Sequence, residues 1–249
     1  NATGATMADD PFTALWVYLA ASPLLWLSLT LLCYLLAVRI YRLGGESPWL
    51  NPVAIAVALL IGLLVLTGTP YRTYFDGAQF VHFLLGPATV SLAIPLYRQR
   101  QRLRRLALPI VAALLAGVLT AASSAVGIGM LLGASTETLI SLAPKSVTAP
   151  VAMGISEKLG GLPSLTAVLV VSTGILGAVL GTGLFRRLGI RDDAVQGFAL
   201  GATSHGIGTA RAFQVSPVAG AFAGLAMALS AFVTALLLPP LLRWIGLVS

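Results

Sequence analysis

The chain has 249 residues, of which 57% are hydrophobic and only 9% are charged, and its mean hydropathy is +0.94. About a quarter of the residues of an ordinary soluble domain are charged, so this composition excludes a soluble protein. The net charge of +7 could indicate a nucleic-acid partner, but the basic residues lie in short clusters between apolar runs, where orientation in a lipid bilayer explains them. We therefore expect the bilayer, and no nucleic acid, as partner.

Long apolar runs follow one another along the chain. About 20 residues of helix cross a hydrocarbon core of roughly 30 Å, and the runs are continuous instead of alternating as in a membrane barrel. They predict an all-α polytopic membrane protein with about seven to nine membrane segments. The runs that qualify or nearly qualify are Asp10 to Arg39, Asn51 to Tyr71, Gly77 to Tyr97, Leu106 to Thr136, Leu159 to Phe185, Ala194 to Ala210 and Ala212 to Leu242.

The start of the chain is interpreted as non-native. Residues 1–6, ahead of Met7, resemble a cloning scar, and no basic region or small-residue cleavage site precedes the first apolar run. We expect the first helix to be retained and residues 7–249 to form a single transmembrane domain. The one cysteine, Cys33, leaves no disulfide framework and no cysteine metal site, and no cofactor is expected.

Arginine clusters predict the orientation, because short cytoplasmic loops are enriched in Lys and Arg. The strongest cluster has five arginines between Arg98 and Arg105. Further arginines follow other apolar runs at Arg39, Arg186 and Arg243. Placing all of these inside predicts a protein of the bacterial cytoplasmic (inner) membrane, with its N-terminus outside and its C-terminus in the cytoplasm.

The sequence contains an internal repeat. Residues 87–92 (PATVSL) resemble residues 144–149 (PKSVTA), and from Pro87 to Pro144 the offset is 57 residues, the same offset that relates Gly117 to Gly174. Inverted repeats are common in transporters, so we predict repeat-like units at 77–133 and 134–190 that cross in opposite senses. The prolines break helices at the bilayer midplane, which is tolerated only beside protein or a cavity. Residues 134–158 could either cross the membrane or form a re-entrant hairpin.

Lys145 is the main candidate for binding a solute. It lies eight residues past Glu137, hence roughly 12 Å deep at 1.5 Å per residue. Ionisable residues at such depth usually face a cavity and mark a pathway; the alternatives are a lysine that reaches the interface or pairs with Glu137. The half-helix ends left by the breaks would present unpaired N–H groups to an anion. The hydroxyls expected to bind with Lys145 are those of Ser146, Thr148, Thr89 and Ser91.

A second polar group lies between Gly197 and Arg211. This stretch has four glycines, three hydroxyls, a histidine and an arginine at membrane depth. Close helix packing explains the glycines but not the polar side chains, and no strand precedes them as a nucleotide-binding motif would require. His205 could relay a proton or bind a carboxylate. The candidate substrate contacts from this stretch are Thr203, Ser204, His205 and Arg211.

Together, residues 144–150 (PKSVTAP) and 201–209 (GATSHGIGT) resemble the LrgB/CidB family, which is similar to the plant plastid glycolate/glycerate translocator. The resemblance implies carriage of small monocarboxylates such as glycolate, glycerate or pyruvate. It also implies an antiholin-like role, tied to the control of murein hydrolases and autolysis. A homo-oligomer and a small membrane partner of the LrgA/CidA type are the protein partners that it implies.

The favoured function is secondary transport of small carboxylates at a midplane site formed by broken helices. The alternative is an antiholin-like protein that acts through oligomerisation in the membrane. An enzyme is not expected, because the apolar runs hold no paired acidic residues and no Gly-x-Ser-x-Gly motif occurs. The side chains of the adjacent Ser204 and His205 would point apart on a helix, so they could not form a catalytic dyad. No ATP-binding Gly-x-x-x-x-Gly-Lys-Ser/Thr loop occurs either, which excludes an intrinsic ATPase.

Overall fold

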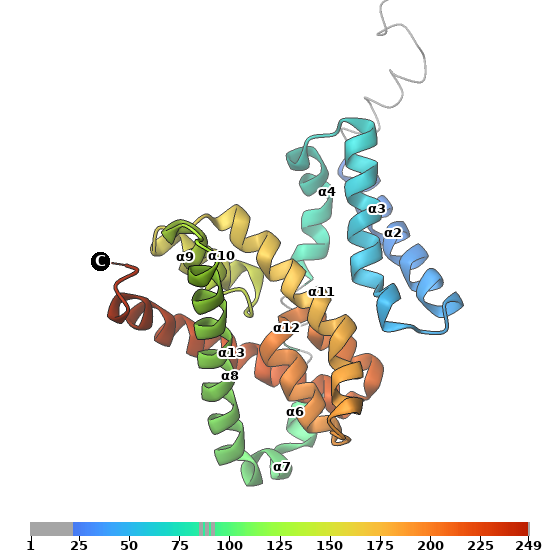
Figure 1. The fold of residues 1–249 in the computed structure, drawn as a ribbon. Helices are drawn as coiled ribbons and strands as arrows, with labels where there is room; N and C mark the ends of the chain where they lie inside the picture. Colours follow the sequence, from blue (N-terminus) through green and yellow to red (C-terminus); the bar gives the residue numbers. More distant parts are fainter. Residues whose placement is uncertain (1–21, 85–86, 88–89, 91–92, 249) are drawn as a thin grey trace, which may run out of the picture. The chain divides into compact units, whose positions relative to one another are not determined.

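The computed structural model describes residues 22–84, 87, 90 and 93–248, and all regular structure among them is helical. The chain divides into two compact units, Asn1–Val90 and Ser91–Ser249 (Figure 1). The expectation of an all-α membrane protein is confirmed, since four of the described helices are long and apolar enough to cross a membrane. These are α2 (Pro23–Leu43), α8 (Ala107–Leu131), α11 (Pro163–Arg187) and α13 (Pro217–Trp244). The number of membrane segments stays a prediction.

The first unit consists of α2, the short 3-10 helix η2 (Pro48–Leu50), α3 (Pro52–Thr67) and α4 (Tyr71–Phe83). The Asn51 side chain caps the N-terminus of α3, because its Oδ1 accepts hydrogen bonds from two backbone N–H groups at 3.0 and 3.1 Å. Trp26 of α2 is fully buried, with its ring edge-on to Tyr74 of α4 at 6.0 Å. Gly77 lets α4 approach the α2 backbone closely. The unit is thus a small bundle around Trp26.

The second unit contains three long helices, α8, α11 and α13, and several shorter ones. The first of them, α6 and α7, carry the arginine cluster, here called the arginine loop (residues 98–105), and lie next to the start of α8 (Figure 1). The shorter elements are α6 (Ala93–Arg98), α7 (Arg100–Arg105), α9 (Thr136–Leu142), α10 (Ala149–Lys158) and α12 (Asp193–Val215).

Helices α9 and α10 form a helical hairpin, called hairpin 1, with a turn over residues 143–148. The end of α10 returns to α9, since Ile155 packs with Ile140. The start of α11 is also there, because the Leu162 N–H donates to the Ser141 hydroxyl at 2.7 Å. Gly129 near the end of α8 packs closely on Leu139 of α9. The end of α8 and the start of α11 therefore lie at the same end of the unit, which favours the re-entrant hairpin of the two arrangements that the sequence leaves open.

Helix α12 forms a second hairpin, called hairpin 2, from arms 193–203 and 206–215. The backbone leaves helical geometry at Ser204 and His205, and beyond this break Ala212 packs against Leu200 of the first arm. Gly208 similarly lies in close contact with the Leu200 backbone. The predicted crossing helix Ala194 to Ala210 is thus wrong in its path, because the chain turns back at the break.

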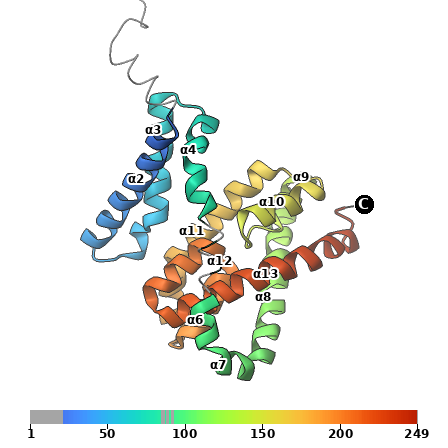
Figure 2. The same ribbon diagram turned by 180° about the vertical axis from the view of Figure 1, so that it is seen from behind.

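The direction of α13 follows from its contacts. Its start lies beside the arginine loop, where the Arg102 guanidinium is 5.7 Å from the centroid of the Phe222 ring. Its other end lies beside hairpin 1 and the end of α8, where Leu242 belongs to one buried cluster with Val126 and Ile140. Figure 2 shows the same course from behind. α13 therefore runs away from the arginine loop.

The expectation that Arg243 lies on the same side as the arginine loop is therefore wrong. Both hairpins return to the end at which they enter, so only α8, α11 and α13 traverse the second unit from end to end. Because three helices, an odd number, run from one end of the second unit to the other, residues 98–105 and Arg243 lie at opposite ends of that unit. The arginines after α11 do lie with the arginine loop, because Arg102 pairs with Asp192 at 2.6 Å.

This topology predicts opposite labelling of two cysteines in intact cells, in a background with Cys33→Ser. With the arginine loop cytoplasmic, a cysteine at Gln101 should react only with membrane-permeant maleimides. A cysteine at Trp244, which is 84% exposed at the end of α13, should also react with an impermeant maleimide. Equal labelling of the two positions by the impermeant reagent would contradict the three-traverse arrangement, and the Cys33→Ser parent serves as the blank.

Candidate functional site

The tips of the two hairpins meet at Val170, in the middle part of α11. Val147, at the tip of hairpin 1, belongs to the same buried hydrophobic cluster as Val170, together with Ala152 of α10. His205, at the tip of hairpin 2, places its ring Nε2 2.9 Å from the Val170 carbonyl oxygen. The two sequence motifs, which are far apart along the chain, are thus brought to one place. Each hairpin reaches this place from its own end of the unit.

Glycines on α11 allow hairpin 2 to come this close. A Cβ atom on Gly174 would lie 2.6 Å from His205 Cε1, and one on Gly177 would overlap the Ser204 hydroxyl. The backbone of His205 has φ of 42° and ψ of −132°, a conformation that residues other than glycine rarely adopt. Such strain costs on the order of 1–3 kcal/mol and persists only when the surrounding structure imposes it. The tip of hairpin 2 is therefore a fixed, strained turn.

A small cavity lies between the tips. Its space is about 10 Å³, which is room for about one water molecule. Hairpin 1 contributes a proline, a serine and two apolar side chains to its walls, hairpin 2 contributes an alanine, and α8 and α13 complete it. We call this space the tip cavity, and its lining residues are Val118, Ala121, Ala122, Ala143, Pro144, Ser146, Val147, Ala202 and Thr234.

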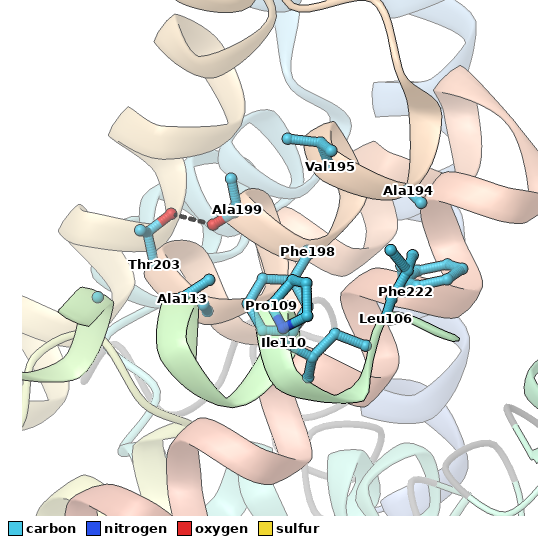
Figure 3. A pocket seen from close by; sticks show the side chains of 12 residues that line it. Leu106, Pro109, Ile110, Ala113, Ala194, Val195, Phe198, Ala199, Thr203 and Phe222 are labelled. Carbon is cyan, nitrogen blue, oxygen red and sulfur yellow. Dashed lines mark hydrogen bonds between the residues drawn. The ribbon is translucent and has the colours of Figure 1, made fainter. Parts of the chain in front are cut away.

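A larger cavity of about 320 Å³ lies on the arginine-loop side of the tip cavity, and we call it the arginine-side cavity. Figure 3 shows the side chains that line it. The first half of α8 and the first arm of hairpin 2 form its walls, with Phe222 of α13. Ala202 borders both this cavity and the tip cavity. The walls of the arginine-side cavity are apolar except for the hydroxyl of Thr203, which donates to the Ala199 carbonyl oxygen at 2.7 Å. Its volume is within the range of small-molecule pockets.

A third cavity, of about 300 Å³, lies between the second half of α8 and the end of α13. We call it the far-side cavity. Ala122 borders both it and the tip cavity. Along α8 the walls of the three cavities follow in order, from Leu106 to Gly117, from Val118 to Ala122, and from Ala122 to Met130. The narrow tip cavity therefore separates two wider spaces.

Positive charge without an acidic partner lies in hairpin 1. The Lys145 ammonium is half-buried, and its one hydrogen-bond contact is to the Ser146 hydroxyl at 3.5 Å. Among the described residues Arg102 and Asp192 form the one salt bridge, so Lys145 and Glu137 are not paired. Each second arm, α10 and residues 206–215, also begins at a tip, so its unpaired N–H groups and positive partial charge lie there. This arrangement suits a small anion.

The structure brings some of the predicted site residues together. Ser146 lines the tip cavity and Thr203 the arginine-side cavity. Ser204 is buried at the break, where it lies 3.2 Å from the Thr203 hydroxyl. Thr148 directly precedes α10, with no side-chain hydrogen bond to the helix start. Ser146 and Thr148 thus belong to the turn of hairpin 1, and Thr203, Ser204 and His205 to the break of hairpin 2.

Other predicted residues lie elsewhere. Arg211 is in the second arm of hairpin 2, more than a turn beyond the tip, and donates a hydrogen bond to the Gln214 side chain at 2.8 Å. Lys145 lines none of the three cavities. Thr89 and Ser91 lie outside the described residues. The role of all these residues in binding stays a prediction.

Sequence reasoning missed Thr234 of α13. Its side chain is only 4% exposed and lines the tip cavity. Its one nearby polar residue is Ser230, a turn earlier in an apolar helix, so the sequence around it gives no motif that could have indicated it. No group of three His, Cys, Asp or Glu side chains that could hold a metal ion occurs within the described ranges.

The fold and the meeting hairpins define a class of helical membrane protein with broken helices at its centre. Comparison with known proteins identifies the family: the chain belongs to the LrgB-like family, whose model matches residues 30–244. It is 38% identical to the protein YwbG of Bacillus subtilis over 88% of this chain and 96% of that protein. It is 32% identical to the holin-like protein CidB of Staphylococcus aureus over 88% of this chain and 95% of that protein. No solved structure matches the chain.

Proposed function

We propose that this protein is a secondary transporter of small monocarboxylates of the glycolate, glycerate and pyruvate type, and that the substrate binds where the hairpin tips meet. The observation that carries the proposal is the order of the cavities along α8. A wide space on each side and a constriction between them is the arrangement that alternating access requires. The tip cavity holds about one water molecule, so this conformation is closed to substrate on both sides.

The charge at the tips supports an anionic substrate. The half-buried Lys145 ammonium lies in the turn of hairpin 1 without a carboxylate partner among the described residues, next to Ser146, which lines the tip cavity. An unpaired cation at membrane depth is costly, so an anion bound beside it would stabilise it. Two helix starts add partial positive charge. A monocarboxylate supplies a single negative charge, whereas the small apolar walls formed by Ala121 and Ala122 favour a substrate of few carbon atoms. Catalysis of a reaction forms no part of this proposal.

An inverted repeat of the two hairpins also supports transport. From Thr136 to Asp193, the starts of α9 and of hairpin 2, the offset is 57 residues. From Ala149, the start of α10, to Gly206, the start of the second arm, it is again 57 residues. α8 and α11, which precede the hairpins, run in opposite directions. We therefore take 107–158 and 163–215 as the repeated units; the units 77–133 and 134–190 predicted from sequence include residues outside the described part and stay a prediction.

The antiholin-like function is the second candidate, because the relatives include proteins with the name holin-like protein CidB. In that case the protein would act through assembly in the cytoplasmic membrane, as a homo-oligomer or with a small membrane partner of the LrgA/CidA type. Such assembly needs outward-facing apolar and small side chains, whereas a lysine and a histidine at meeting hairpin tips contribute nothing to it. We therefore favour transport, with the arginine loop on the cytoplasmic side.

Uptake by purified protein in liposomes separates the two candidates. A carrier should accumulate labelled glycolate or pyruvate with saturable kinetics, and excess unlabelled substrate should inhibit this uptake. The same liposomes, loaded with a fluorescent dye larger than the tip cavity, should not release the dye. Dye release without saturable uptake would support a pore-forming role and contradict the carrier, and protein-free liposomes provide the background.

A further inference from the structure

The hydroxyl of Thr234 differs from most buried hydroxyls of this protein. Serine and threonine in membrane helices ordinarily donate to a backbone carbonyl three or four residues earlier in their own helix. Thr173 and Thr203 do so at 2.7 Å, and Ser230, one turn before Thr234, donates to the Met227 carbonyl oxygen at 3.1 Å. Within the described part of the chain, the side-chain hydroxyl of Thr234 makes no hydrogen bond, although the residue is only 4% exposed and its backbone is part of α13.

The position of Thr234 indicates a reason for this. It lines the tip cavity from α13, together with the tip of hairpin 1 and the Ala202 end of hairpin 2. Apart from Ser146, the other side chains that line this cavity are alanine, valine and proline. The hydroxyl oxygen of Thr234 is not one of the fully enclosed side-chain atoms that lack a partner, so it is open to this space, where a water or a ligand can pair with it. The space between the tips has room for such a water molecule.

We propose that Thr234 determines specificity at this site, by pairing with the oxygen on carbon 2 of the substrate. This inference rests on the proposed transport of small monocarboxylates. The carboxylate would lie toward the positively charged tips, with Ser146 beside it. The substituent on carbon 2 would then lie against α13, where the hydroxyl of Thr234 can accept from a 2-hydroxyl group or donate to a 2-keto oxygen.

Discrimination between acids with and without an oxygen on carbon 2 follows from the free-energy cost of leaving the Thr234 hydroxyl unpaired. An acid without an oxygen on carbon 2 would displace the water from the Thr234 hydroxyl and put a C–H group in its place. A site that hydrogen-bonds a substrate hydroxyl rejects analogues without it, because its own polar group is then left unpaired. One such group corresponds to about tenfold in relative uptake. Thr234 should therefore separate glycolate from acetate, and pyruvate from propionate.

The test compares uptake of labelled glycolate and labelled acetate by purified protein in liposomes. The wild type should prefer glycolate by about tenfold. Thr234→Val, which keeps the shape and removes the hydroxyl, should lose this preference, because glycolate loses its hydrogen bond to the side chain and acetate no longer leaves a hydroxyl unpaired. Thr234→Ser should keep the preference. Ser230→Ala is the matched control, because that hydroxyl is on the same helix, is buried and is already bonded within the helix; it should behave as the wild type.

Three outcomes would overturn the inference. They are a wild type that takes up glycolate and acetate equally well, a Thr234→Val variant that keeps the preference, and a Ser230→Ala variant that loses the preference to the same degree. A wild type that takes up neither acid, nor pyruvate, would instead overturn the proposed function on which the inference rests. Failure of the two ideas is thus distinguishable in one set of liposomes.

Discussion

Replacement of Lys145 by alanine should lower carboxylate uptake by at least about tenfold while the protein still inserts and folds. A hydrogen bond to a charged group contributes about 1.5–3 kcal/mol, which corresponds to about tenfold to about a hundredfold in binding. The Lys145 ammonium lies in the turn of hairpin 1 and donates to the Ser146 hydroxyl at 3.5 Å. Its removal breaks no ion pair among the described residues. Initial uptake rates in liposomes, normalised to inserted protein, measure the effect.

Two further variants make this test specific. Lys158→Ala is the matched control, since Lys158 is the other lysine of the chain and is exposed at the end of the same hairpin. It should transport as the wild type does. Lys145→Arg should restore uptake poorly, because a planar guanidinium does not replace a compact ammonium. Uptake by Lys145→Ala at the wild-type rate would make the lysine a structural residue and would move the binding site toward Thr203 and Ser204.

The class of fold could be predicted from the sequence because length and hydropathy alone decide whether a helix can cross a bilayer. The path of the chain could not. Hairpin 2 and a straight helix have the same apolar composition over residues 193–215, and the reversal depends on contacts with distant residues such as Gly174. The error on Arg243 has the same origin. With hairpin 2 counted as a crossing, the charge rule put all arginines on one side, and the rule is statistical at a terminus with one arginine.

The site was predictable where it consists of motifs and not where it consists of a single side chain. Ser146 and Thr203 belong to conspicuous polar stretches in apolar surroundings, and both border a cavity. Thr234 has only Ser230 as a nearby polar residue in sequence and enters the site only because α13 passes both hairpin tips. For Lys145 the sequence indicated a depth but not a direction, and its neighbour Ser146 is the residue that lines the tip cavity.

Replacement of Gly201 by alanine should strongly destabilise the second unit, although it adds only one methyl group. Gly197 and Gly201, four residues apart, let the first arm of hairpin 2 lie directly on α13. A Cβ atom on Gly201 would overlap the backbone carbonyl of Ala223, and one on Gly197 that of Ala219. A clash with backbone cannot be relieved by a rotamer change, so the helices must separate. Overpacking of this kind costs about 1–3 kcal/mol, occasionally more.

The loss should appear in both stability and transport. The next residue, Ala202, borders the tip cavity and the arginine-side cavity, so a displaced first arm opens the constriction between them. We expect Gly201→Ala to lower the melting temperature in detergent and to reduce saturable uptake. Gly183→Ala on α11 is the control, because a Cβ atom there meets nothing within 4 Å and alanine favours the helix by about 1 kcal/mol. If Gly201→Ala melted and transported like Gly183→Ala, the direct packing of hairpin 2 on α13 would be refuted, and the tip cavity could not be the constriction of the pathway.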